Sequence, residues 1–269
     1  MGIQALLSDP LSYIRQILLM LPAILPALVL HECAHGWVAY KLGDPTAKML
    51  GRLSLNPLKH LDPVGTLSLV FLGLGWARPV PVNPRYFKNL RRDDLMVSLA
   101  GITANLIMFL MGCLMVLAFL AAGLRAVPQD MLYGASGYLV RLDDGLYSIA
   151  FSDVAAYPLS MSEVLIAPYL GTVWGLIYEI VVNFTLINLG LAIFNLIPIP
   201  PLDGYHVLND VILRRPLFAS RQAAYMGQGV MLVLLWTGVL GKGLSAVEDF
   251  ILGGVGAVFA GIFRLAGLM

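Results

Sequence analysis

The stretch that decides the fold is QILLMLPAILPALVLHECAHGWVAY, residues 16–40. Residues 16–30 carry no charge, and they lead directly into His31, Glu32 and His35. An ionisable side chain at membrane depth costs at least about 2.5 kcal/mol unless it has a partner. Three such side chains within one apolar helix therefore predict a functional site at membrane depth.

The overall composition points to the same environment. Of the 269 residues, 59% are hydrophobic and 12% are charged, and the mean hydropathy is +0.82. Soluble domains carry about 25% charged residues, so we expect an integral membrane protein that forms one domain over residues 1–269. A net charge of +1, with no basic run longer than two residues, indicates no nucleic-acid partner.

Apolar stretches long enough to cross a bilayer occur five times, at about 13–40, 95–124, 176–199, 224–241 and 247–267. The expected fold is therefore an all-α polytopic membrane protein with about five transmembrane helices. The stretch from Thr66 to Ala77 is too short to cross and is rich in glycine. It favours a re-entrant or strand-forming hairpin that packs against protein or water.

The distribution of charge predicts which side of the membrane each loop occupies. Residues 41–94 hold nine Lys and Arg, whereas residues 125–168 hold two against five acidic residues. The positive-inside rule puts 41–94 and 203–222 in the cytosol and 125–168 outside a cell membrane. Five crossings then give an outer N-terminus and a cytosolic C-terminus. The first apolar stretch lacks a basic n-region, so we expect a retained helix and not a signal peptide.

The spacing of the two histidines suits a metal ion. Positions four apart share a face of a helix, so His31 and His35 can offer imidazole nitrogens to one tetrahedral zinc ion. Glu32 could take a proton from zinc-bound water and deliver it to the leaving amine. The alternative is a pair of histidines that only hydrogen-bond within the bundle, which the cost of unpaired ionisable groups in lipid disfavours.

Zinc in a catalytic site needs a third protein ligand, and Asp203 is the candidate. It follows the proline-rich stretch 195–201, where helical hydrogen bonding is denied, and it precedes Gly204. We expect the freedom of this glycine to turn Asp203 back into the bundle, at the cytosolic depth of His35. The alternative for Asp203 is a helix N-cap.

Two asparagines on one face of the third span could assist the reaction. Asn195, or Asn188 seven residues earlier, could donate to the oxyanion of a tetrahedral intermediate. The alternative for each is a hydrogen bond between helices.

Other polar residues have less specific interpretations. His60 is a rival ligand, but its polar loop favours a solvated or loop-bracing role. His206 could support the site from behind Asp203 or be exposed. Cys33 and Cys113 are predicted to be small buried residues and form no disulfide framework. Glu179 is expected near the outer interface.

The chain resembles the site-2 protease family of zinc intramembrane metalloproteases, in particular its compact bacterial members. The resemblance covers about residues 20–215. Besides HECAH it is carried, in order, by GRLSLNPLKHLDPVGT (51–66), GWARPVPVNPRYF (75–87), AGITAN (100–105) and FNLIPIPPLDG (194–204). It implies His31, His35 and Asp203 as ligands of one zinc ion, Glu32 as catalytic base, and Asn195 as a substrate-stabilising residue.

The resemblance also implies an architecture and a substrate class. It implies a three-helix catalytic core within about 11–215, β-like substrate-docking segments at about 50–85, and a single-pass membrane protein or signal-peptide remnant as substrate. Many relatives carry PDZ or CBS modules, which these 269 residues lack. We expect the outer insertion 125–168 to be a weakly ordered loop, with a lid or partner surface as alternative, and 222–267 to form a helical pair.

The function that we expect is therefore hydrolysis of peptide bonds within or beside transmembrane helices. The rival class is a non-enzymatic metal protein, such as a zinc transporter or a catalytically silent homologue. A transporter needs ionisable residues along a full transmembrane path, and a silent homologue is expected to lack Glu32 or a ligand.

Overall fold

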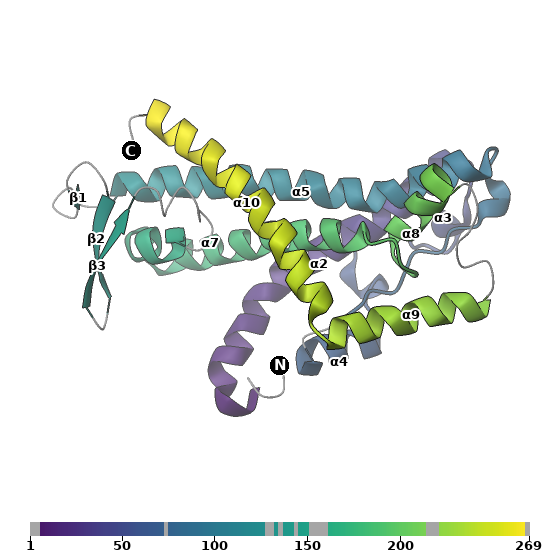
Figure 1. Cartoon of the computed structure of the whole chain (residues 1–269), viewed down its shortest axis with the longest axis horizontal. Coiled ribbons are helices and arrows are strands. Elements are labelled where there is room, and N and C mark those ends of the chain that lie inside the picture. The colour runs from purple at the N-terminus through teal and green to yellow at the C-terminus, as the bar shows by residue number, and fades with distance from the viewer. Residues whose placement is uncertain are drawn as a thin grey trace.

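The computed structural model describes residues 6–72, 75–126, 132–133, 137–142, 145–150, 161–213 and 221–266 (Figure 1). Its helices are α2 (Pro10–Lys41), α3 (Thr46–Met49), α4 (Pro63–Leu72), α5 (Leu90–Ala126), α7 (Met161–Asn195), α8 (Asp203–Val207), α9 (Arg221–Trp236) and α10 (Val239–Leu265). The 3-10 turns η1 (Pro57–Lys59) and η2 (Pro84–Tyr86) and the π-helical turn η4 (Leu208–Leu213) connect them.

Three long helices, α2, α5 and α7, pack against one another and form the centre of the molecule. In Figure 1, α5 and α7 run side by side and α2 crosses them obliquely. Helix α2 begins where the sequence favours it: Asp9 accepts a hydrogen bond from the backbone N–H of Ser12, and Pro10 occupies the first helical position. This trio corresponds to the three-helix core that the resemblance implied.

The all-α polytopic architecture is confirmed, with a different number of crossings. Among the described residues, four helices are long and apolar enough to span a membrane: Pro10–Lys41, Leu90–Gly123, Gly171–Asn195 and Val239–Leu265. The fifth expected span, 224–241, falls in α9, which has 16 residues. At 1.5 Å per residue such a helix is about 24 Å long, shorter than the hydrocarbon core of about 30 Å.

The path of α9 and α10 differs from the two successive, opposed crossings that the sequence predicts. In Figure 1, α9 leads from the α8 end of the molecule towards its middle, and α10 continues towards the end that carries the strands. The two expected spans thus advance in the same direction, joined at Gly238, whose φ is 71°. Helix α10 therefore ends towards the end of the molecule that carries the strands, and the side of the membrane on which the C-terminus lies stays a prediction.

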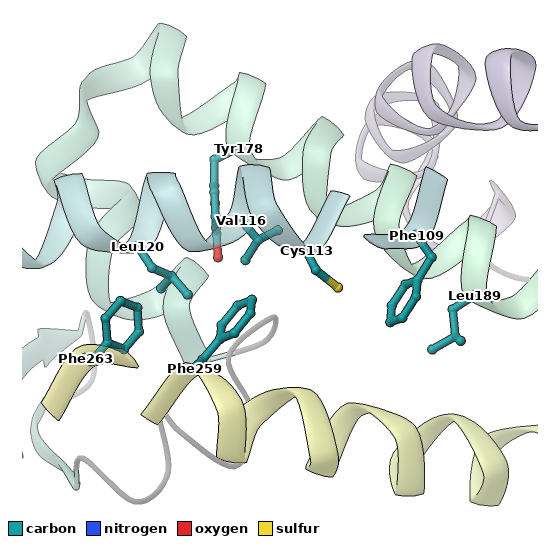
Figure 2. Packing of buried hydrophobic residues seen from close by; sticks show 8 residues of the cluster. All are labelled: Phe109, Cys113, Val116, Leu120, Tyr178, Leu189, Phe259 and Phe263. Carbon is teal, nitrogen blue, oxygen red and sulfur yellow. The ribbon is translucent and has the colours of Figure 1, made fainter. Parts of the chain in front are cut away.

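An apolar cluster between α5, α7 and α10 explains this direction of α10 (Figure 2). Phe259 and Phe263 of α10 lie beside Leu120, close to the end of α5 that leads into the insertion. Cys113, a free thiol, is buried in the same cluster, as its apolar context predicted. The cluster consists of Phe109, Cys113, Val116, Leu120, Tyr178, Leu189, Phe259 and Phe263.

The described part of the insertion contains strands that the sequence analysis did not expect, and the weakly ordered loop stays a prediction. Strands β1 (Leu132–Tyr133), β2 (Gly137–Leu142) and β3 (Gly145–Ala150) form an antiparallel sheet in the order β1-β2-β3. The register pairs Gly137 with Ala150 and Leu142 with Gly145. The apolar runs on either side of the sequence Asp143-Asp144-Gly145 are the sequence signal for this strand pair.

The 50–85 region is less β-like than expected. The apolar stretch after Pro63 forms helix α4, because a proline suits the first turn of a helix and aliphatic residues follow it. The chain then returns, and Leu61 and Ala77 form an isolated antiparallel bridge. The region is therefore re-entrant, with a helical first arm and an extended second arm.

Candidate metal centre

Three predicted ligands, from two elements distant in the sequence, meet at one point. His31 and His35 lie one turn apart on α2, and Asp203 is the first residue of α8. The two Nε2 atoms are 3.0 Å apart, and Asp203 Oδ2 lies 3.5 Å from Nε2 of His31 and 3.4 Å from Nε2 of His35. Among the described residues this is the group of side chains that could hold a metal ion.

The second nitrogen of each imidazole fixes the orientation of its ring. His35 Nδ1 donates to the backbone carbonyl of Val97 at 2.8 Å, and His31 Nδ1 lies 3.0 Å from Asn105 Oδ1. A carbonyl oxygen only accepts hydrogen bonds, so the proton of each neutral ring sits on Nδ1. Both Nε2 atoms are then left with a free lone pair, as ligand histidines require.

The meeting of these atoms needs a cation. Two nitrogen lone pairs and a carboxylate oxygen converge, and the buried Asp203 Oδ2 has no hydrogen-bond partner among the described residues. Three acceptors at this distance repel one another unless a positive charge lies between them. Zinc–ligand bonds of about 2.0–2.1 Å in a tetrahedron separate the ligands by about 3.3 Å. The observed separations agree, so these residues fit a zinc ion.

Two glycines allow the elements to approach the site. A Cβ on Gly101 of α5 would lie 2.3 Å from His35 Nε2 and 2.5 Å from His31 Cε1. A Cβ on Gly204 would lie 2.2 Å from the carbonyl oxygen of Leu196. The expected reason for Gly204, conformational freedom, is corrected: it lies within α8, and the space for its missing side chain is what α8 needs.

The proposed base and the two candidate asparagines form hydrogen bonds away from the three converging ligand atoms. Glu32 Oε2 accepts a hydrogen bond of 2.7 Å from the backbone N–H of Val80. Asn195 Nδ2 donates to the carbonyl of Leu191, four residues earlier in its own helix, at 2.9 Å. Asn188 is fully buried and likewise donates within α7, so the sequence-based role of either asparagine stays a prediction.

The rival histidines have other partners. His60 is 1% exposed and its Nε2 lies 2.8 Å from the carbonyl oxygen of Ser54, so the loop-bracing interpretation is confirmed and the solvated one is wrong. His206 bonds to Asp94 of α5 through Nδ1 at 2.8 Å. This hydrogen bond to a carboxylate raises the pKa of His206 above its usual value, although burial acts in the opposite direction.

Several supporting residues escaped the sequence analysis. Asn105 and Gly101 are four residues apart in the AGITAN stretch, so they share a helix face, and a glycine and an amide together in an apolar span are a usable signal. Glu179 has a partner that its position did not reveal, since Arg15 Nη2 lies 2.6 and 2.7 Å from its two oxygens. Val80 bonds to Glu32 through its backbone N–H, and a pattern of side chains in a sequence cannot indicate such a contact.

Comparison with known proteins gives consistent matches. The sequence model described as Peptidase family M50 matches residues 19–236. "Putative zinc metalloprotease YwhC" of Bacillus subtilis (strain 168) is 37% identical over 240 residues, which cover 88% of this chain and 90% of that protein. "Putative zinc metalloprotease Rip2" of Mycolicibacterium smegmatis is 27% identical over 238 residues, covering 87% of this chain and 72% of that protein. No solved structure matches.

Proposed function

This chain belongs to peptidase family M50 and is a multi-pass membrane zinc metalloprotease, and we propose that it cleaves other proteins within or beside their transmembrane segments. The observation that carries this proposal is that Asp203 of α8 meets His31 and His35, which lie on an apolar helix of membrane-spanning length. A cation held there would supply Lewis acidity at a depth where lipid would otherwise exclude water.

We assign His31, His35 and Asp203 as the ligands of one zinc ion per chain. Zinc bound there would supply Lewis acidity, which lowers the pKa of water and polarises a peptide carbonyl. Asn105 and the carbonyl of Val97 hold the two imidazoles in the tautomer that leaves Nε2 free. Gly101 keeps α5 clear of both rings.

Glu32 is the proposed general base. It follows His31 directly, and it would take a proton from the attacking water and pass it to the nitrogen of the leaving amine. Asn195 is the proposed donor to the oxyanion, a role that typically contributes about 3 kcal/mol to the transition state. Its amide group has a second N–H besides the one bonded to Leu191, so the existing bond is compatible with that role.

The substrate class follows from the depth of the site. A peptide bond within a helix is shielded by its own hydrogen bonds, so a transmembrane substrate must unwind locally before it is cleaved. Single-pass membrane proteins and signal-peptide remnants are the proposed substrates. The proposed orientation is an outer N-terminus and a site towards the cytosol, because His35 lies six residues, or about 9 Å, before Lys41 and the basic residues after it.

Two substitutions test this function. Glu32→Gln should keep zinc bound but cause membrane-tethered protein fragments to accumulate in cells, which quantitative proteomics of membranes would detect. Asp203→Asn should lower the zinc content of purified, dialysed protein, whereas Asp9→Asn, at the start of α2, should leave it unchanged. Normal fragment processing by Glu32→Gln would refute the peptidase mechanism, and unchanged zinc in Asp203→Asn would refute the ligand assignment.

A further inference from the structure

A proline-flanked backbone amide faces the proposed base. The segment Arg78-Pro-Val-Pro-Val-Asn83 has prolines on both sides of Val80. Proline has no N–H, so Val80 supplies the only amide hydrogen of residues 79–81. Each proline also disfavours the helical conformation for the residue before it, which keeps Arg78 and Val80 extended. A single donor is thus presented on a chain that resists refolding into a helix.

That donor is bonded to Glu32. The backbone nitrogen of Val80 lies 2.7 Å from Glu32 Oε2, a short distance typical of a charged acceptor. The side chain of Val80 is buried and lies over Gly36, where a Cβ would come within 2.8 Å of its Cγ1. Glu32 and Gly36 are one helical turn apart, so the same face of α2 receives both the amide and the side chain of Val80.

Both ends of the segment are attached to other parts of the protein. The N–H of Arg78 donates to the carbonyl of His60 at 2.7 Å, and the N–H of Asn83 donates to the buried carboxylate of Asp44 at 2.6 Å. The hydrogen bonds to His60 and Asp44 therefore hold the segment, and with it the Val80 amide, independently of the contact with Glu32. A donor that is already in place costs no reorganisation when the reaction occurs.

We propose that the backbone N–H of Val80 positions the catalytic base. By holding Oε2 of Glu32 it restricts the rotation of the carboxylate and keeps Oε1 in place for proton transfer, which depends on hydrogen-bond geometry. This inference rests on the proposed function, because it takes Glu32 as the base. It makes Val80 a positioning residue whose contribution comes from its main chain.

Substitutions that change the amide and not the charge test the proposal. Val80→Pro removes the N–H, Val80→Ala keeps it, and Val82→Pro adds a proline to the same segment two residues further on. The readout in cells is the rate at which the fragments that accumulate with Glu32→Gln disappear. Val80→Pro should slow this rate by about 10- to 100-fold, an effect typical of residues that support a metal site. Val82→Pro should keep most of the wild-type rate, Val80→Ala should lose far less activity than Val80→Pro because it keeps the amide, and all three should retain zinc. A wild-type rate for zinc-loaded Val80→Pro would overturn the proposal.

A spectroscopic measurement decides the contact even if Val80→Pro does not fold. In protein labelled with ¹⁵N-valine, the resonance missing from Val80→Ala identifies the Val80 amide. The charged acceptor should shift this amide proton downfield in the wild type, and Glu32→Ala should move it upfield without moving that of Val82. An unmoved Val80 resonance would overturn the proposal. Normal fragment processing by Glu32→Gln would instead refute the proposed function, while the resonance still reports on the contact.

Discussion

At the scale of single residues, both ligand histidines are held by partners from another element. His31 and His35 on α2 are oriented by Asn105 and by the carbonyl of Val97, both on α5. Such outer partners fix the tautomer and raise the basicity of the ligand nitrogen. Gly101 contributes through its lack of a side chain, because a Cβ there would overlap both imidazoles.

Replacement of Gly101 by alanine tests this packing. The added methyl carbon would lie 2.3 Å from His35 Nε2, so at least one imidazole must move away from the metal position. We expect Gly101→Ala to lose most peptidase activity and to bind zinc at least about tenfold more weakly, measured by metal competition with a chelator.

Gly253→Ala is the matched control for that substitution. It also replaces a helical glycine, in α10, but the new Cβ would meet no atom within 4 Å. It should leave zinc binding unchanged and raise stability by about 0.5–1 kcal/mol, because alanine favours a helix over glycine. Equal zinc affinity in Gly101→Ala and Gly253→Ala would contradict the role assigned to Gly101.

At the scale of elements, α8 is too short to hold its own position, and contacts with α5 fix it. Asp203 opens this five-residue helix, and His206, on its last turn, bonds to Asp94 of α5. Arg91 of α5 donates to the backbone carbonyl of Asp210 just beyond α8. These contacts connect the third ligand to the helix that already supports the other two.

The ion pair between His206 and Asp94 gives a prediction for pH. The pKa of His206 is raised by its hydrogen bond to Asp94, so its contribution to stability is fully present below about pH 6.5 and is lost as pH rises through the raised value. We expect the melting temperature of His206→Gln to lie below that of the wild type at pH 6 and to approach it at pH 8.5. Because the His206 side chain is 45% exposed, the difference should be small.

Comparison of the two proteins isolates this pair. His31 and His35 are present in both, so their titration cancels in the difference between the two melting temperatures. Asp94→Asn should remove the pH dependence of the same difference. A difference that stays constant from pH 6 to 8.5 would show that the pair does not link α8 to α5.

At the scale of the whole molecule, α10 packs obliquely against α5 and α7 and ends towards the end of the molecule that carries the strands (Figure 1). Helices α9 and α10 advance in one direction, so we expect them to cross the membrane once together and not twice. Buried Phe259 and Phe263 of α10 pack in one apolar cluster with Leu120 of α5, which favours this direction.

Reporter fusions test this topology. A reporter fused after Met269 and one inserted between residues 143 and 144 should be labelled by a membrane-impermeant reagent from the same side of the membrane. A reporter inserted after Lys88, next to η2, should be labelled from the opposite side. Labelling of the Met269 and Lys88 fusions from the same side would restore the five-crossing topology.

Local patterns were enough to predict the membrane class and the three side chains, His31, His35 and Asp203, that the structure brings together. Apolar length identifies a span, and the spacing of His31 and His35 brings them together on any helix, because both properties depend only on neighbouring residues. Asp203 was predictable since its proline-rich approach ends a span at the depth of the histidines.

What only the tertiary structure decided depends on contacts between distant residues. The direction of α10 goes with its packing on α5 and α7, and no charge pattern in the sequence indicates that packing. The amide of Val80, the carbonyl of Val97 and the missing side chain of Gly101 act through the main chain or through empty space. These features have no side-chain chemistry to recognise in a sequence, so they become visible only when the chain is folded.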